Sequence, residues 1–582
     1  MEEKMNLEKK VRFAIFLMAI PLLFSVCSKT TETVSGTGAA PAIRPARVLA
    51  DVPHPTQDPY GKYTPAINVT VIHISNDGAF WFPPGDSIDS NIYTRRWERD
   101  LGIKYEFLWT SPSSQATEKF NIMVSTGELP DFFTVTKLQF EQLYSAGMLE
   151  DITDAIIDYA SDYLREHLVG VYQDLLDCAT RNGRYYGIGA GNAFIDTANV
   201  PWLRKDYMDT LGLTAPRTID ELDAFMGVMK SRNPAGLSAS QTFPLAVQGA
   251  DQGPSSYIMN PAFYWMFNSY PPLWANPIWY KNSRGELEHG MFGTESRSGT
   301  RAALEKAREF YRKGYISPNF GTDTYDLMVE NLAQGRALVY FGDVWGSWWP
   351  LPVTLDNDSN ADWLPIDLPQ GGSQPARMAG DQVTASYILV ARKGVKNPEA
   401  LVKMSNLFLD LNSDPAKMEF NTYNTDPDDS NQIFLAYPLI IHNPAFNVDA
   451  LNDITYAQNT GDPSRLCEAF RSFYDTAMDY SRNKDINGWP SYRSYLKDGT
   501  SLAVTNSYIQ GNMVVYNEYT AEPTLFMIEN EPTVKRIFDT MAVGVISGAL
   551  DMSEYDRFIS QWDNLYGNTA TKEVNDWYNN RR

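Results

Sequence analysis

The sequence predicts an α/β protein built from two lobes. At 582 residues the chain is longer than a single hydrophobic core usually grows, so at least two lobes are expected. Between residues 68 and 135, segments typical of strands and helices alternate in the order strand, helix, strand, helix, strand. This alternation favours βαβ units and a largely parallel sheet, with binding loops at the carboxyl ends of the strands.

Runs of β-branched residues and their breakers place the first elements. Residues 68–75 (NVTVIHIS) read as a strand that ends at Asn76-Asp77-Gly78. The alternation then predicts a helix over 95–101, a strand over 103–108, a helix over 118–125 and a strand over 131–135. Beyond residue 186 helices dominate: a capping box at Thr218 and Glu221 starts one, and 301–313 is amphipathic. A late apolar run, 385–391, predicts a strand that returns to the first lobe, and a helix follows through residue 409.

The N-terminus has the features of an export signal. Lys9, Lys10 and Arg12 precede an apolar run over 13–24, which is too short to span about 30 Å of hydrocarbon. Cys27 follows at once, as in the bacterial lipobox whose thiol is acylated, although Val26 departs from the usual small residue. We therefore expect a signal peptide over 1–26 and a lipidated Cys27 that anchors the chain to the bacterial cell membrane. A flexible Ser/Thr/Gly/Pro-rich tether is expected over 27–65.

Composition excludes some partners and suggests another. The net charge of -22, with no basic cluster, would repel nucleic acid and anionic lipid surfaces. Aromatic residues make up 13% of the chain, which suits a ligand with both apolar and hydroxylated faces. Cys178 and Cys467 could pair in an extracellular setting or remain two buried thiols, and their spacing leaves both alternatives open.

Six segments, in order along residues 67–580, carry a family resemblance. They are 125–131 (STGELPD), 147–153 (GMLEDIT), 182–188 (NGRYYGI), 204–221 with its RKDYMDTLGL block, 331–337 (NLAQGRA) and the closing 558–578. Together they resemble the extracellular solute-binding proteins of ABC importers, in the branch of sugar-binding lipoproteins. This resemblance implies a two-lobed, periplasmic-binding-protein-like fold that closes on a carbohydrate and hands it to permease subunits. It implies a monomer, no cofactor and no reaction.

The resemblance also implies how the chain is shared between the lobes. The first lobe is expected over 66–187 and again over 381–425, and the second over 188–380 and 426–582. Two departures from the family pattern matter. Residues 232–236 (RNPAG) lack the acids of a calcium loop, so no metal is expected there. The proline that follows the Tyr-Gly of this strand in relatives is missing, and Gly189 and Gly191 stand nearby instead, which suggests a looser hinge.

Aromatic rings and polar groups in loops form the predicted carbohydrate site. The aromatic candidates are Trp81, Tyr186, Trp265, Trp345, Trp348 and Trp489, and the polar candidates are Asp86, Arg204, Asp206, Asp343 and Asp381. Structural alternatives remain for several, including an ion pair for Arg204 or Asp206 and a turn cap for Asp343. Trp345, Trp348 and Trp349 cannot be three equal stacking platforms because 348 and 349 are adjacent, so at least one is expected in the core.

Catalytic motifs are sparse. The five histidines are scattered, and the chain has no HExxH motif, Cys/His cluster or nucleophile elbow. Asp356, Asp358, Asn360 and Asp362 have the alternate spacing of a calcium loop, but Ala361 stands where that loop needs glycine, so a solvated acidic turn is expected. A secreted glycan-active hydrolase or lyase remains the rival hypothesis, because the spacing of a carboxylate pair is spatial and not sequential. A surface adhesin is less consistent with the strand and helix alternation.

Overall fold

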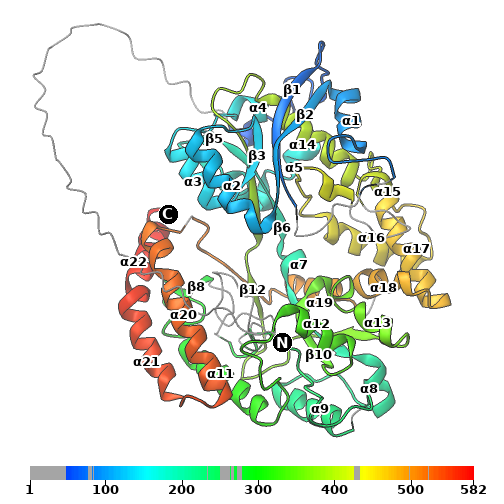
Figure 1. Cartoon of the computed structure of the whole chain (residues 1–582), viewed down its shortest axis with the longest axis vertical. Helices are drawn as coiled ribbons and strands as arrows, with labels where there is room; N and C mark the ends of the chain where they lie inside the picture. Colours follow the sequence, from blue (N-terminus) through cyan, green and yellow to red (C-terminus); the bar gives the residue numbers. More distant parts are fainter. Residues whose placement is uncertain are drawn as a thin grey trace, which may run out of the picture. The chain divides into compact units, whose positions relative to one another are not determined.

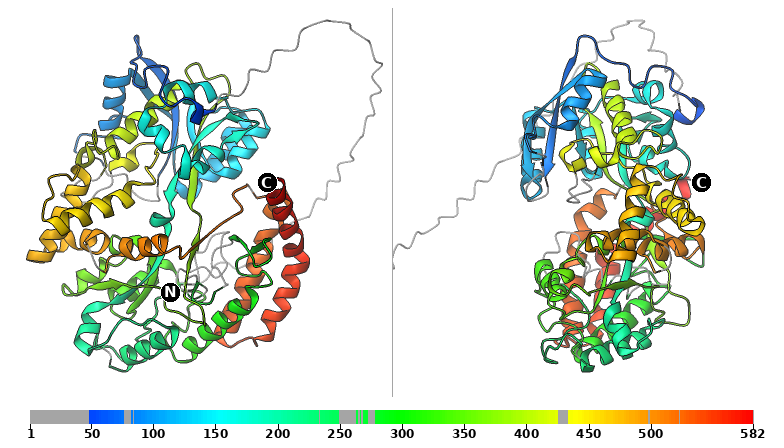
Figure 2. Two further views of the ribbon diagram at one scale, coloured as in Figure 1. Left: turned by 180° about the vertical axis from the view of Figure 1, so that it is seen from behind. Right: turned by 90° about the vertical axis from the view of Figure 1, so that its right-hand side faces the viewer.

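The strands and helices form two lobes (Figures 1 and 2). Each lobe has a large hydrophobic core. The computed structural model describes residues 48–75, 82, 84–232, 234–248, 263, 266, 268–271, 278–424, 433–496, 499–521 and 523–581. The core that includes Trp97 and Ile188 defines the first lobe, and the core that includes Trp202 and Phe538 defines the second. The prediction of a two-lobed α/β protein is confirmed.

The first lobe is built on two small sheets covered by helices. Strand β1 pairs in parallel with β2, and β13 pairs with both β3 and β6. The elements of this lobe are η1 (Leu49–Asp51), β1 (Ile67–Ser75), α1 (Ile92–Leu101), β2 (Ile103–Pro112), α2 (Ser113–Thr126), β3 (Phe132–Val135), α3 (Lys137–Ser145), α4 (Thr153–Tyr159), α5 (Asp162–Glu166), η2 (Gly170–Tyr172), α6 (Asp174–Asp177), β4 (Thr180–Arg181), β5 (Arg184–Tyr185), β6 (Gly187–Ala193), β13 (Val383–Ala391), α14 (Glu399–Asn412) and η4 (Ile433–Ala436).

The expectation of a largely parallel sheet is wrong. Among the described strands only β1–β2 and β12–β14 pair in parallel, and the other ladders are antiparallel. The reason is the route of the chain: β6 leads out of the first lobe, whereas β13 leads back into it and pairs beside β6 and β3. A strand that re-enters a sheet from the far side must run against the strand that left it.

The second lobe combines short strands with long helices. Strand β7 is central to the antiparallel order β10-β7-β11, β8 and β9 form a hairpin, and β12 pairs with β14. Helices α11 and α20 to α22 lie side by side in Figure 1. The elements are β7 (Asn199–Arg204), α8 (Lys205–Leu211), α9 (Ile219–Arg232), β8 (Trp279–Lys281), β9 (Leu287–His289), α11 (Arg297–Arg312), α12 (Tyr325–Ala333), β10 (Val339–Asp343), η3 (Val344–Ser347), α13 (Val353–Asn357), β11 (Trp363–Pro365), β12 (Met378–Gly380), β14 (Val514–Tyr516), α20 (Leu525–Ser547), α21 (Ser553–Trp562), η6 (Asp563–Gly567) and α22 (Asn568–Arg581).

A third, smaller core of helices packs beside the first crossing segment. It includes Ala193 and Ile195 from the end of β6 and from α7, together with Phe470 and Tyr495. Its elements are α7 (Phe194–Thr197), α15 (Phe420–Tyr423), α16 (Phe446–Thr460), α17 (Glu468–Asn483), η5 (Ile486–Gly488), α18 (Trp489–Tyr495) and α19 (Ser501–Gln510). The chain therefore leaves the first lobe through β6 and α7, and it returns through β12 and β13.

Two stretches lie elsewhere than expected. Residues 48–65 do not act as a tether but run along the first lobe, where the amide of the buried Leu49 donates to Tyr185 Oη at 3.1 Å. Tyr63 Oη likewise donates to Glu399 Oε1 at 2.6 Å. Ile433 and Tyr437, which follow the boundary expected at 426, belong to the first core. Both placements depend on contacts with residues far away in the chain, and such contacts leave no periodic pattern in the sequence.

Local signals placed several helices correctly. Thr218 Oγ1 accepts the amide of Glu221 at 3.1 Å at the start of α9, as the capping box predicts. The strands expected over 68–75 and 131–135 correspond to β1 and β3. None of the helices within the described ranges is both long and apolar enough to cross a membrane.

Candidate functional site

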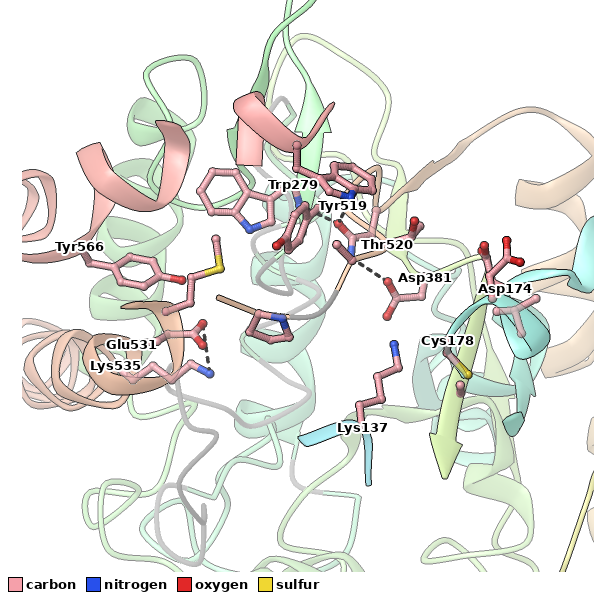
Figure 3. A pocket seen from close by; sticks show the side chains of 18 residues that line it. Lys137, Asp174, Cys178, Trp279, Asp381, Tyr519, Thr520, Glu531, Lys535 and Tyr566 are labelled. Atoms are coloured by element: carbon pink, nitrogen blue, oxygen red, sulfur yellow. Dashed lines mark hydrogen bonds and ion pairs between the residues drawn. The ribbon is translucent and has the colours of Figure 1, made fainter. Parts of the chain in front are cut away.

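A cavity of about 560 Å³ is lined by residues of both lobes (Figure 3). The first lobe contributes Lys137 from α3 and the α6 region with Asp174, Asp177 and Cys178. The returning segment contributes Asp381 and one face of β13. The second lobe contributes β8, the segment after β14, α20, η6 and α22. Because its walls come from both lobes, a molecule in this cavity would contact both of them.

Lys137 is positioned by the end of strand β3 and by a helix cap. Thr136 follows β3 and caps α3, with Thr136 Oγ1 accepting the Gln139 amide at 3.3 Å and Gln139 Oε1 accepting the Thr136 amide at 2.9 Å. Lys137 is the first residue of α3 and points into the cavity in Figure 3. A lysine at the carboxyl end of a strand fits the expectation that binding groups gather there.

The α6 region reaches the cavity because β6 carries a glycine beneath it. A Cβ atom at Gly189 would lie 2.3 Å from the Leu175 carbonyl oxygen and 2.9 Å from Cys178 Sγ. Any larger residue would push α6 off the strand. Gly189 therefore allows close packing of α6 on β6. This packing sets where Asp174, Asp177 and Cys178 lie.

Asp381 is held by an amide network at the second crossing. Asn517 Nδ2 donates to Asp381 Oδ1 at 2.9 Å, and Asn517 Oδ1 accepts the backbone amide of Trp279 at 2.9 Å. The backbone N–H of Asn517 also donates to the Gly380 carbonyl oxygen at 2.9 Å. One asparagine thus ties the returning segment to β8. It leaves the Asp381 carboxylate half-exposed beside the cavity.

Aromatic rings form another part of the wall. Trp577 and Tyr519 meet edge to face, with ring centroids 5.0 Å apart and planes at 78°. Trp279 is buried against His289, with centroids 5.4 Å apart. Burial lowers the pKa of His289 to about 3, so this imidazole is neutral at physiological pH. Rings of this kind offer apolar surface to the C–H face of a sugar.

Charged groups complete the lining. On α20, Glu531 Oε1 lies 3.3 Å from Lys535 Nζ, and Figure 3 shows this pair at the edge of the cavity. Asp174, Asp177 and Asp381 add three more carboxylates to the lining. Within the described ranges, no group of three or more His, Cys, Asp or Glu side chains is arranged to hold a metal ion. The arrangement can accept hydrogen bonds from hydroxyls and stack a ring.

Among the predicted site residues that the structure describes, only Asp381 belongs to the cavity lining. Arg204 is 2% exposed and has a structural role: its guanidinium binds Asp206 through two bonds of 2.8 and 2.7 Å and Asp358 at 3.0 Å. It also lies 4.1 Å above the Tyr207 ring centroid. The ion-pair alternative therefore describes Arg204 and Asp206 in this structure.

The other tryptophan candidates lie away from the cavity lining. Trp489 is fully buried, and its Nε1 donates to Asp362 Oδ1 at 3.0 Å. Trp345 and Trp348 pack against the third core, and their indole N–H groups donate to the Asp196 carbonyl and to Ser494 Oγ, each at 2.9 Å. Trp349, absent from the predicted set, is the ring that protrudes, at 56% exposure.

The remaining candidates are placed as follows. Asp86 pairs with Arg95 through bonds of 2.8 and 3.1 Å, and Tyr186 packs edge to face on Tyr144. Asp343 ends β10, where burial of its carboxyl raises the pKa of that group. Trp81, Trp265 and Cys27 lie outside the described residues. Neither Cys178 nor Cys467 is part of a disulfide.

Sequence reasoning missed most of the lining. Trp279 and Trp577 could have been included for their type, and Lys137 for its place after a strand. Asp174 and Asp177 had no signal, because their position depends on how α6 packs on β6. Asn517 is also invisible in sequence, since its partners lie 136 and 238 residues away.

Comparison with known proteins places the chain in a family. The profile of the family described as "Bacterial extracellular solute-binding protein" matches residues 83–410, which is more than half of the chain. The chain belongs to this family. The resemblance seen in the sequence is thereby confirmed, and a solute-binding protein is expected to have two lobes around its ligand.

Individual relatives of this solute-binding protein are distant in sequence. The polygalacturonan/rhamnogalacturonan-binding protein YtcQ of Bacillus subtilis is 21% identical over 84% of this chain and 88% of its own. Lipoprotein LipO of the same organism is 24% identical over 28% of this chain and 31% of its own. Among solved structures, FusA of S. pneumoniae in complex with kestose superposes with a TM-score of 0.61 at 15% identity, covering 88% of this chain and 99% of FusA. This structural likeness shows the shared fold.

Proposed function

We propose that this solute-binding protein captures an oligosaccharide outside the cytoplasm and delivers it to the transmembrane subunits of an ABC importer. The observation that carries the proposal is the cavity whose walls come from both lobes and combine aromatic rings, carboxylates, lysines and an amide. Its volume of about 560 Å³ falls within the roughly 300–1,000 Å³ typical of small-molecule sites. The names of YtcQ and of the FusA complex with kestose support a carbohydrate as the ligand class.

Capture works through closure of the two lobes. Lys137 and Asp174 belong to the first lobe, whereas Tyr519 and Trp577 belong to the second. A ligand that touches all four contributes binding free energy only when the lobes are close, so it shifts the population toward the closed form. Asp381 lies where the chain returns between the lobes, so it can contact the ligand while its Asn517 partner holds the segment.

Binding and not turnover is the proposed activity. The purified protein would be heated with a panel of oligosaccharides while the mixtures are analysed for released reducing sugar or unsaturated products. A rise in melting temperature without product supports the proposal. Product release would instead identify a secreted hydrolase or lyase and overturn it.

Cys178 offers a direct test that this cavity is the binding site. Its thiol lines the cavity, so a bound ligand should slow its alkylation. A variant with Cys27→Ser and Cys467→Ser leaves Cys178 as the single thiol reporter. Protection by a saccharide that also raises the melting temperature is expected. Binding without protection would place the site elsewhere.

We also propose attachment to the membrane surface through Cys27. The signal-like run before it supports this, as does similarity to a protein named as a lipoprotein. Mass spectrometry of the protein from membranes should find a diacylglyceryl-modified N-terminal cysteine, and Cys27→Ala should release the protein from membranes. A membrane-bound Cys27→Ala variant would contradict the anchor and leave saccharide binding untouched.

A further inference from the structure

The lining of the cavity carries more acid than base. Asp174, Asp177, Asp381 and Glu531 face two lysines, so acidic groups exceed basic groups by two. Lys535 lies 3.3 Å from Glu531 on the same helix, and its charge is balanced there. The rest of the lining has Lys137 and three aspartates, Asp174, Asp177 and Asp381. A carboxylate that entered this cavity would meet an excess of like charge.

The carboxylates are placed to accept hydrogen bonds from hydroxyl groups. Asp381 Oδ1 accepts one bond from Asn517, and an ionised carboxylate has about four acceptor positions in total. Asp174 lies in the first turn of α6, and both it and Asp381 are half-exposed. Hydroxyls of an uncharged sugar donate to such oxygens, whereas a uronate carboxylate offers only acceptors at that position.

A strong anion site would need a guanidinium fork or several lysines. No arginine belongs to the cavity lining among the described residues. The net charge of -22 adds a repulsive field at long range.

Aromatic surface supplies the complementary part of the site. Trp577 and Tyr519 present rings at 78° to each other, next to the segment that carries Asn517. Stacking on these rings is available to any pyranose or furanose and does not require charge. Ligand discrimination by charge therefore falls to the carboxylates.

From this we infer that the site selects saccharides without carboxylates and rejects uronate-containing glycans. The inference rests on the proposed function, because it specifies which sugars that site takes. It separates this chain from YtcQ, whose name refers to polygalacturonan, a polymer with a carboxylate on each sugar unit.

Matched oligosaccharides test the inference. Melting-temperature shifts and calorimetry would compare neutral fructo-, gluco-, galacto-, xylo- and manno-oligosaccharides with galacturono-, glucurono- and mannurono-oligosaccharides of equal length. We expect the neutral series to contain the ligand and every acidic counterpart to bind at least about tenfold more weakly, equivalent to about 1.4 kcal/mol. The gap should narrow at high salt, since screening weakens repulsion at a solvent-open site.

Two variants connect the discrimination to named groups. Asp174→Asn with Asp177→Asn removes two negative charges from the lining and should reduce the gap between neutral and acidic oligosaccharides by about tenfold. Asp453→Asn is the matched control, because this exposed aspartate lies on α16 and not in the lining, and it should leave the gap unchanged.

Three outcomes of these experiments distinguish the inference about charge selectivity from the proposed function, oligosaccharide capture. Neutral-selective binding that the paired variant relaxes supports both. Binding of an acidic oligosaccharide as tightly as its neutral counterpart, or more tightly, overturns the inference while oligosaccharide capture stands. Absence of binding by either series overturns the proposed function, and the inference falls with it.

Discussion

Adding one methyl group at Gly189 should displace the cavity wall from beneath. The Cβ of Gly189→Ala would lie 2.3 Å from the Leu175 carbonyl oxygen, about 1.1 Å inside the 3.4 Å at which ordinary contact begins. Strand β6 cannot retreat freely, because it pairs with β13 from Gly187 to Ala193. The α6 region must therefore move by about an ångström. We expect the free energy of unfolding to fall by about 1–3 kcal/mol, the usual range for overpacking.

The displacement should reach the site as well as the core. Asp174, Asp177 and Cys178 move with α6, so ligand affinity should fall and Cys178 alkylation should change its rate. Urea unfolding and alkylation in the single-thiol background measure the two effects. Gly372→Ala is the control, since a Cβ there meets nothing within 4 Å. A Gly189→Ala protein with unaltered urea midpoint, alkylation rate and affinity would refute the reasoning.

Three further predictions concern groups outside the cavity. Trp348→Ala should lower the free energy of unfolding by about 2–3 kcal/mol, because it removes a ring packed on the third core and a hydrogen bond to Ser494. Trp349→Ala should change the free energy of unfolding by less than about 0.5 kcal/mol, because this ring is exposed. Equal urea midpoints for the two variants would contradict this prediction. Burial raises the pKa of Asp196 to about 7, so the folded state loses stability as pH rises from about 4 to 7. The melting temperature of Asp196→Asn relative to the wild type should therefore increase across that pH range and stay constant above it. A difference in melting temperature that does not change with pH would rule this out. Arg204→Met should lower the free energy of unfolding, measured in urea, by about 2–4 kcal/mol, because it leaves the Asp206 carboxylate without its two hydrogen bonds from Arg204. Arg204→Lys should restore only part of this free energy. Full restoration would mean that the two-bond contact of the guanidinium is not needed.

Local patterns predicted the elements whose causes are local. The β-branched run at 68–75 became β1, and the Thr218 cap became the start of α9. The failure over strand direction has a different cause. Residues 383–391 predict a returning strand but not the direction in which it runs beside its neighbours, so βαβ alternation favoured a parallel sheet where β13 runs antiparallel.

The tryptophan-rich stretch shows the same limit for binding residues. The sequence indicated that three indoles could not all be platforms, and the adjacency of Trp348 and Trp349 justified this. Their contacts are set by Asp196, 149 residues from Trp345, and by Ser494, 146 residues from Trp348. Composition could nominate these rings as candidates, but only packing shows that Trp349 protrudes while the other two are held.

The sequence by itself determined the family, the two-lobed α/β class and the position of Asp381 at the second crossing, because ordered motifs and strand signals are encoded over short spans. The tertiary structure decided which residues share a cavity. Lys137, Asp174, Asp381 and Trp577 meet because β13 returns beside β6, Gly189 admits α6, and the C-terminal helices close the far wall. Contacts between residues hundreds of positions apart depend on side-chain volume and on the direction of the chain. A short stretch of sequence therefore cannot predict them.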